Sequence, residues 1–150
     1  MTTKPADKAS STVAVLLGAV VGPFVVAAIV IWVMSGFSDY EKVASAFVRD
    51  VAGGRCEAAY ARMATPYRAS VPRERFCASL ARNAWFRGAT GVTFARTVNN
   101  SGGASGSGTM QRASGDVAVR VHFVEEGDAW TITNVTVAGS NAVPSPADAP

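Results

Sequence analysis

The longest hydrophobic run in the sequence extends from Val13 to Met34, where 22 consecutive residues carry no charge. A helix of that length rises about 33 Å, enough to cross a hydrocarbon core about 30 Å thick. The run also has no polar face, whereas a helix in a small soluble domain has one. We therefore predict a transmembrane helix over residues 13–34. A cleavable secretory signal, which has a shorter apolar stretch, is the alternative.

The charges that flank this run indicate its orientation. Lys4 and Lys8 precede it, whereas two of the three charged residues that follow closely, Asp39, Glu41 and Lys42, are acidic. Basic residues tend to remain on the cytoplasmic side of a span. We expect a plasma (inner) membrane protein with a cytoplasmic tail of residues 1–12 and an extracytoplasmic remainder.

Small residues recur at every fourth position in the first half of this span, at Ala14, Gly18 and Gly22. This pattern allows two transmembrane helices to approach closely. We therefore expect the span to contact the lipid bilayer and either a membrane-protein partner or, in a homodimer, a second copy of this chain.

After the span, apolar residues recur at helical spacing in three segments. Ser38-Asp39-Tyr40-Glu41 has the form of a capping box and introduces a helix that Gly53-Gly54 ends. Its apolar stripe comprises Tyr40, Val43, Ala44, Phe47, Val48 and Val51. A second short helix is expected over about residues 55–63, and a third from near Ser70. The inward side chains of these two helices would include Cys56 and Cys77.

From Gly91 onward the apolar period changes to two, which predicts strands. A first strand starts at Val92, and the Gly- and Ser-rich residues 99–109 are expected to form a mobile loop. The clearest strand covers residues 116–124, with valines and Phe123 inward. The apolar phase changes within the last strand, residues 130–137, which predicts a β-bulge near Thr133-Asn134. Residues 139–150 are small and proline-rich, and we expect a disordered tail.

Three helices followed by three to four antiparallel strands predict an α+β domain over residues 38–138, with the helices packed on one face of a curved sheet. The segments FVRDVAGGRCEAAYARM and AWTITNVTV resemble the nuclear-transport-factor-2-like cone fold, in its small bacterial membrane-anchored form. This resemblance implies a fold. It implies no single function, because the family includes isomerases, hydratases and binding domains.

The two cysteines, Cys56 and Cys77, predict a disulfide. Both lie on inward stripes of neighbouring predicted helices, and an even cysteine count in a small extracytoplasmic domain is typical of a disulfide. Two buried reduced thiols are the alternative. Two cysteines and a single histidine without ligand spacing do not predict a metal site, and no motif predicts a cofactor.

No residue is predicted to be catalytic. His122 is out of phase with the apolar positions of its strand and should point away from the helices. Asp50 is expected on the polar side of its helix. Eight arginines between Arg49 and Arg87 most simply form a solvated helix surface, and a net charge of +3 without a basic run does not indicate nucleic-acid binding.

The pattern as a whole predicts a single-pass membrane protein whose extracytoplasmic domain binds a partner protein or a small ligand without catalysis. An isomerase- or hydratase-like enzyme that uses the interior of the cone is one alternative. An assembly subunit that acts through its transmembrane helix is another.

Overall fold

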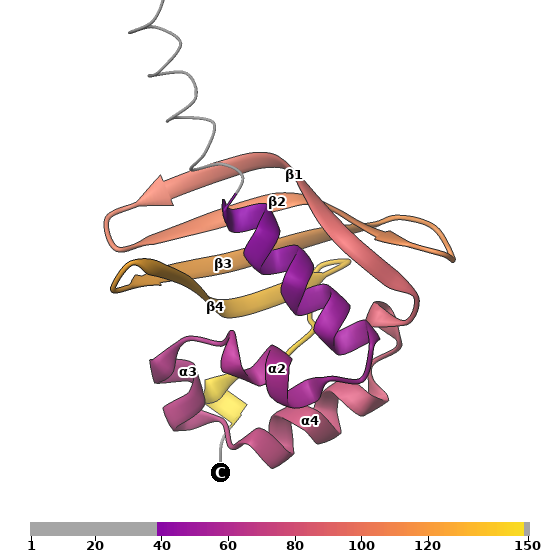
Figure 1. The fold of residues 1–150 in the computed structure, drawn as a ribbon, viewed down its shortest axis with the longest axis horizontal. Coiled ribbons are helices and arrows are strands. Elements are labelled where there is room, and N and C mark those ends of the chain that lie inside the picture. The colour runs from indigo at the N-terminus through magenta and orange to yellow at the C-terminus, as the bar shows by residue number, and fades with distance from the viewer. Residues whose placement is uncertain (1–38, 149–150) are drawn as a thin grey trace, which may run out of the picture. The chain divides into compact units, whose positions relative to one another are not determined.

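The computed structural model describes residues 39–148, in which four helices precede an antiparallel five-stranded sheet (Figure 1). The predicted α+β class is therefore confirmed. The predicted cytoplasmic tail, the span over residues 13–34 and its packing residues Ala14, Gly18 and Gly22 lie outside the described residues. Within residues 39–148, no helix has the length and apolarity that crossing a bilayer requires.

The first described helix covers residues 39–52 and buries the apolar stripe expected from the sequence. Tyr40, Ala44, Phe47 and Val48 on this stripe are all buried. Gly54, with a φ of +72°, follows the end of the helix. This left-handed backbone conformation is one that glycine adopts without steric cost, so the Gly-Gly pair ends the helix as predicted.

Three shorter helices follow, where the sequence pattern predicted two. They are α2 (Cys56–Ala61), α3 (Thr65–Ser70) and α4 (Arg73–Arg82). The sequence pattern left residues 64–69 between the two predicted helices, but Thr65-Pro66 begins α3 there. Proline is tolerated in the first helical turn because the amide hydrogen it lacks has no partner within the helix.

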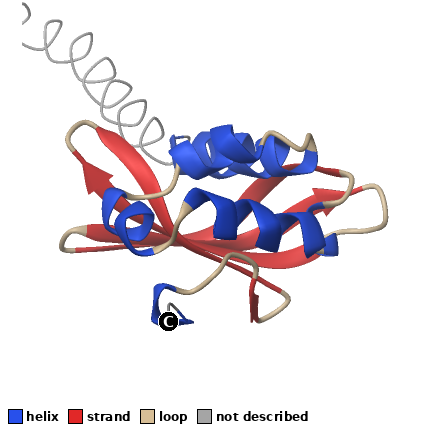
Figure 2. Cartoon of the chain, turned by 90° about the horizontal axis from the view of Figure 1, so that it is seen from below, coloured by secondary structure: helices blue, strands red, loops and turns tan. Residues whose placement is uncertain are grey.

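The five strands form a meander in sequence order, β1-β2-β3-β4-β5, in which every pair is antiparallel. Figure 2 shows the helices that precede the sheet packed on one of its faces, whereas β5 and the short C-terminal helix lie toward the other side. The strands are β1 (Ala89–Asn100), β2 (Gly103–Arg112), β3 (Val117–Glu126), β4 (Ala129–Val137) and β5 (Ser140–Asn141). Single-turn 3-10 helices lie at Ala84–Phe86 and Pro146–Asp148.

The expected mobile loop over residues 99–109 is wrong, because most of it is strand β2. The connection between β1 and β2 is only the short turn at Ser101-Gly102. Ala104 and Met110 on β2 are buried, and the Phe94 ring of β1 lies against Gly106. Gly106 therefore leaves room for a neighbouring aromatic ring, a role that composition alone does not distinguish from loop flexibility.

The bulge predicted in the last strand is confirmed. His122 is paired with Asn134, but the next residue, Phe123, is paired with Ile132, which leaves Thr133 as the extra residue of β4. This insertion restores the phase, so that Ile132 and the two valines after it, Val135 and Val137, are all buried.

The expected disordered tail is wrong for residues 139–148. Strand β5 pairs with β4, and Ala142 and Val143 are buried. The Tyr67 hydroxyl donates a hydrogen bond of 2.9 Å to the Pro144 carbonyl oxygen. The Asn83 side-chain amide donates one of 3.0 Å to the carbonyl oxygen of Ala142. Small, proline-rich composition suggested disorder, but the tertiary contacts of these few residues hold the segment in place.

Bulky apolar side chains fill the space between the helices and the sheet. Phe47 meets Phe76 and Phe86 edge-on, with ring centroids 6.5 and 6.0 Å apart. Fully buried side chains from both layers surround these rings, among them Met63, Val71, Met110, Val121, Ile132 and Val135. Within residues 39–148, these side chains pack against each other between the two layers.

Candidate functional site

Cys56 and Cys77 form the predicted disulfide. Cys56 opens α2 and Cys77 lies near the middle of α4, with their Cα atoms 5.6 Å apart. This separation is usual for a bridged pair. Both side chains are partly buried and pack against the hydrophobic core. The bridge therefore joins two helices that are separated in the chain by α3.

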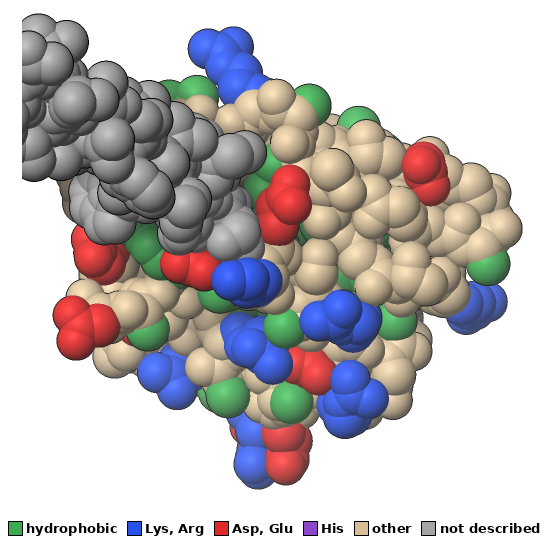
Figure 3. Space-filling model, turned by 45° about the horizontal axis from the view of Figure 1, so that its top comes forward, with side chains coloured by type: hydrophobic (Ala, Val, Ile, Leu, Met, Phe, Trp, Pro, Cys, Tyr) green, Lys and Arg blue, Asp and Glu red, His purple; other side chains and the backbone are tan. Residues whose placement is uncertain are grey.

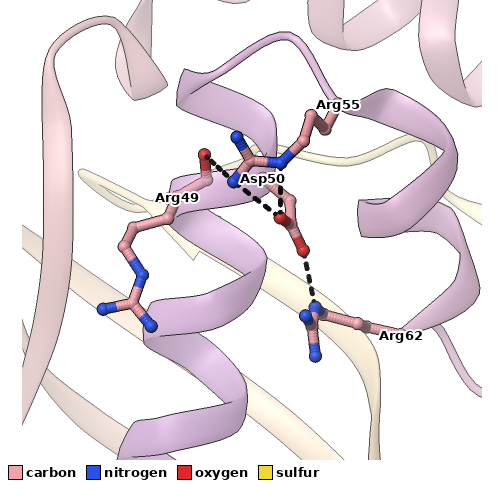
Figure 4. Close-up of polar contacts among 4 residues, drawn as sticks. All are labelled: Arg49, Asp50, Arg55 and Arg62. Atoms are coloured by element: carbon pink, nitrogen blue, oxygen red, sulfur yellow. Dashed lines mark hydrogen bonds and ion pairs between the residues drawn. The ribbon is translucent and has the colours of Figure 1, made fainter.

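Asp50 is buried, contrary to the sequence prediction that it lies on a polar helix side. Figure 4 shows its carboxylate between Arg55 and Arg62. One oxygen accepts hydrogen bonds of 3.0 and 2.9 Å from Arg55, and the other accepts one of 2.7 Å from Arg62. Arg55 and Arg62 lie in the segment that follows this helix and folds back over its end. The spacing of residues within one helix cannot reveal partners that lie beyond it.

The ion pairs of Asp50 determine what its carboxyl can do. Burial by itself would raise the pKa of Asp50, but hydrogen bonds from Arg62 and Arg55, together with their positive charges, outweigh burial and lower the pKa. A general base needs a raised pKa and a free oxygen near substrate. Asp50 has neither, so its role is to hold the first helix to α2 and to the segment after it.

His122 lies on the sheet face opposite to the helices, as its strand phase predicts. It alternates along β3 with the buried residues Val121 and Phe123. The cross-strand register places Ser105 and Asn134 on either side of it. We call this surface the outer face. It comprises Thr93, Arg96, Val98, Ser105, Ser107, Thr109, Gln111, Ala118, Arg120, His122, Asn134 and Thr136.

A groove of about 380 Å³ lies on the outer face, with Arg120 and His122 in its lining. Small residues make room for it, because Ala118, Ser107 and Gly108 lie beside the longer side chains. Thr136 and Gly139 complete one side, where the chain turns from β4 to β5. The remaining lining residue is Val119.

The sequence alone did not predict this groove. The alternation of β3 places Arg120 and His122 on one face, which could be read from the sequence. The small residues beside them, Ser107 and Gly108, belong to β2, whose composition predicts a loop. The groove could not be predicted because β2 was not recognised as a strand.

The arginines of the helical segments do not form a continuous basic patch. In Figure 3 the basic side chains in the lower half of the view are interspersed with acidic and apolar ones. Arg55 and Arg62 pair with Asp50, and Arg73 pairs with Glu57 and Glu74. These pairs fit the interpretation of a solvated helix surface.

No cluster suited to a metal ion is found within residues 39–148, where no three His, Cys, Asp or Glu side chains gather. The described part of the chain is thus a disulfide-bridged α+β domain with a packed interior and a polar groove on its outer face. Comparisons with models of known protein families, with curated proteins and with solved structures find no match to the chain.

Proposed function

We propose that the chain is a single-pass membrane protein whose disulfide-bridged domain lies outside the cytoplasm and binds a partner protein or small ligand without catalysis. Residues 13–34 would anchor it in the inner membrane, and residues 1–12 would remain in the cytoplasm. The fold we propose for the domain is the nuclear-transport-factor-2-like cone. Helices that precede an antiparallel meander and cover one of its faces support this assignment.

The Cys56–Cys77 disulfide is the observation that carries the proposal. Disulfides persist in oxidising compartments and are rare where glutathione keeps thiols reduced. A charge-free stretch long enough to span a bilayer, placed before the bridged domain, provides a route to such a compartment.

The packed interior supports binding over catalysis. The isomerase or hydratase alternative needs polar groups that converge on a substrate inside the cone. Among the described residues, Asp50 is the one buried charged side chain, and two arginines occupy its oxygens. His122 lies on the outer face. These positions favour recognition at the surface of the domain.

Thiol labelling of intact bacterial cells that express the full-length chain tests the proposal. A membrane-impermeant maleimide should modify Cys56 and Cys77 only after a reductant has been added to the cells. Labelling without reductant would contradict the disulfide. Labelling that requires permeabilised cells would contradict the extracytoplasmic location.

A matched variant tests the other side of the membrane. In a chain with Cys56→Ala and Cys77→Ala, a single Ser10→Cys substitution should be labelled only after permeabilisation. Labelling of this cysteine in intact cells would contradict the proposed orientation. Release of the domain into the medium without residues 1–34 would show a cleaved signal in place of an anchor.

A further inference from the structure

We propose that the outer-face groove is a binding site for a small ligand that carries an oxyanion group, a phosphate or a carboxylate. The inference deepens the proposed function, because it names a site and a ligand chemistry for the binding role. It rests on the register of the strands, on the contacts of Arg120 and on the charges that surround the groove.

The register aligns basic and hydroxyl side chains in one row across the sheet. Arg96 on β1 is paired with Ser107 on β2, Ser107 with Arg120 on β3, and Arg120 with Thr136 on β4. Side chains that pair directly across strands lie on the same face. His122 lies two residues further along β3, about 7 Å from Arg120. Basic and hydroxyl groups therefore border the groove together.

Arg120 is oriented by its neighbour and keeps its terminal nitrogens available. Its Nε donates a hydrogen bond of 3.1 Å to the Ser107 hydroxyl. The two terminal amino groups of the guanidinium can then point to one ligand. A planar guanidinium donates two parallel hydrogen bonds to a phosphate or a carboxylate, and such bonds are about twice as strong as those between neutral groups.

The outer face lacks the negative charge that would neutralise these arginines. None of the twelve positions defined above is Asp or Glu. Glu126, which continues the same alternation at the end of β3, accepts hydrogen bonds from the amide and hydroxyl of Thr65. Within the described residues no carboxylate lies within ion-pair distance of Arg96 or Arg120. A solvated strand face usually mixes both signs of charge. Arg120 supplies the permanent charge of the groove lining, and a recess whose charge has one sign concentrates the electrostatic field, which attracts an anion.

The size and lining of the groove define the ligand further. A volume of about 380 Å³ is in the range of small-molecule sites. The hydroxyls of Ser107 and Thr136 can hydrogen-bond either an oxyanion or the polar body that carries it. The same oxyanion could belong to a free small molecule or to the headgroup of an anionic lipid, and the experiment must distinguish these sources.

His122 provides the readout, because it is the only histidine in the chain. We would follow its ring carbon–proton resonances by NMR, using the full-length chain in nanodiscs of phosphatidylcholine at constant pH and ionic strength. Inorganic phosphate, exchanged against chloride, should shift these resonances in a saturable way. In a second arm without phosphate, discs that contain phosphatidylglycerol replace the phosphatidylcholine discs.

The variants separate the groove from a general charge effect. Arg120→Gln should weaken the phosphate response by about tenfold or more, because it removes a charged hydrogen-bond donor. Arg120→Lys retains the charge but loses the pair of parallel hydrogen-bond donors, and should weaken the phosphate response less. Arg82→Gln makes the same charge change at the end of α4 and should leave the response unaltered. Because Arg120 and Arg82 are exposed, both variants should unfold at the wild-type urea concentration.

Each outcome bears on the proposal. A saturable phosphate shift that Arg120→Gln weakens supports a free oxyanion ligand, and a shift only with phosphatidylglycerol that the same variant abolishes supports a headgroup. Absence of a saturable shift in both arms, or equal shifts in the wild type and Arg120→Gln, overturns the oxyanion site. The thiol labelling described above reports location independently, so failure of one experiment leaves the other interpretable.

Discussion

At the scale of single residues, the junction of β1 and β2 depends on the absence of a side chain at one position. A Cβ atom added to Gly108 would collide with the backbone of Thr93 and with the Cα atom of Phe94, next to the bulge of β1. In Figure 1, β1 bends in its middle part. At Gly106 the three atoms nearest to the added one all belong to the ring of Phe94, at 2.8 Å, and a ring can move more easily than a backbone. The two glycines are therefore expected to differ in their tolerance of substitution.

Gly108→Ala should destabilise the domain by about 2–3 kcal/mol, the upper part of the range for overpacked sites. Gly106→Ala should cost less, about 1–2 kcal/mol, because the ring of Phe94 can shift. Ser105→Ala, on the same strand but on the outer face, is the control and should change stability by less than about 0.5 kcal/mol. Urea unfolding of the full-length variants measures all three. Equal stability of Gly108→Ala and Ser105→Ala would contradict the close packing of β1 on β2.

Asp50 gives a second residue-scale prediction, which concerns pH. Because its folded pKa is lowered, its ion pairs stabilise the domain fully above its unfolded pKa, about 3.9. That stabilisation is lost as the pH falls through the lowered folded value. Asp50→Asn should therefore cost about 1–3 kcal/mol at pH 7, and the difference from the wild type should shrink at the most acidic pH.

The pH dependence of urea unfolding, from pH 7 to pH 2.5, tests this prediction. Glu57→Gln is the control, because Glu57 pairs with Arg73 on the exposed surface and such pairs are worth about 0–1 kcal/mol. A constant difference between Asp50→Asn and the wild type over the whole range would show that the Asp50 carboxylate is not coupled to folding.

At the scale of secondary-structure elements, prediction from the sequence succeeded where a repeated pattern faces one continuous core. The helix over residues 39–52, strand β3 and the bulge of β4 all follow from the spacing of apolar residues. Prediction from the sequence failed where a few tertiary contacts determine the structure. Strand β2 has glycines where other strands have large side chains, and Asp50 is buried by arginines beyond its own helix. The groove was not predicted either, because part of its lining belongs to β2.

Residues 139–148 are a second segment whose composition wrongly predicts disorder. Truncation of the chain tests their role in folding. A chain that ends at Ala138 loses the buried side chains of Ala142 and Val143, and leaves Tyr67 and Asn83 without their carbonyl partners. We expect a loss of about 2–4 kcal/mol. A chain that ends at Ser145 keeps these contacts and should unfold within about 1 kcal/mol of the full-length chain. Equal stability of the two truncated chains in urea would show that residues 139–145 do not contribute to folding.

At the scale of the whole molecule, one covalent link joins helices that the chain connects only through α3. The domain over residues 39–148 is small, and small domains bury a lower fraction of their surface, so a crosslink matters more to them. Cys56 and Cys77 are 21 residues apart. Closing a loop of this length removes conformational freedom from the unfolded chain, which stabilises the folded state by about 3 kcal/mol in the chain-entropy model.

Reduction of the disulfide should therefore lower the free energy of unfolding by about 3 kcal/mol, without changing the fold. The Cys56→Ala/Cys77→Ala variant should lose a similar amount, and a reductant should then have no further effect on it. Urea unfolding with and without dithiothreitol, with free thiols counted in the same samples, makes the comparison. If the wild type releases two thiols and keeps its stability, the bridge does not support the fold. A domain with reduced thiols would then fold equally well, and the bridge would indicate the compartment without being needed for folding.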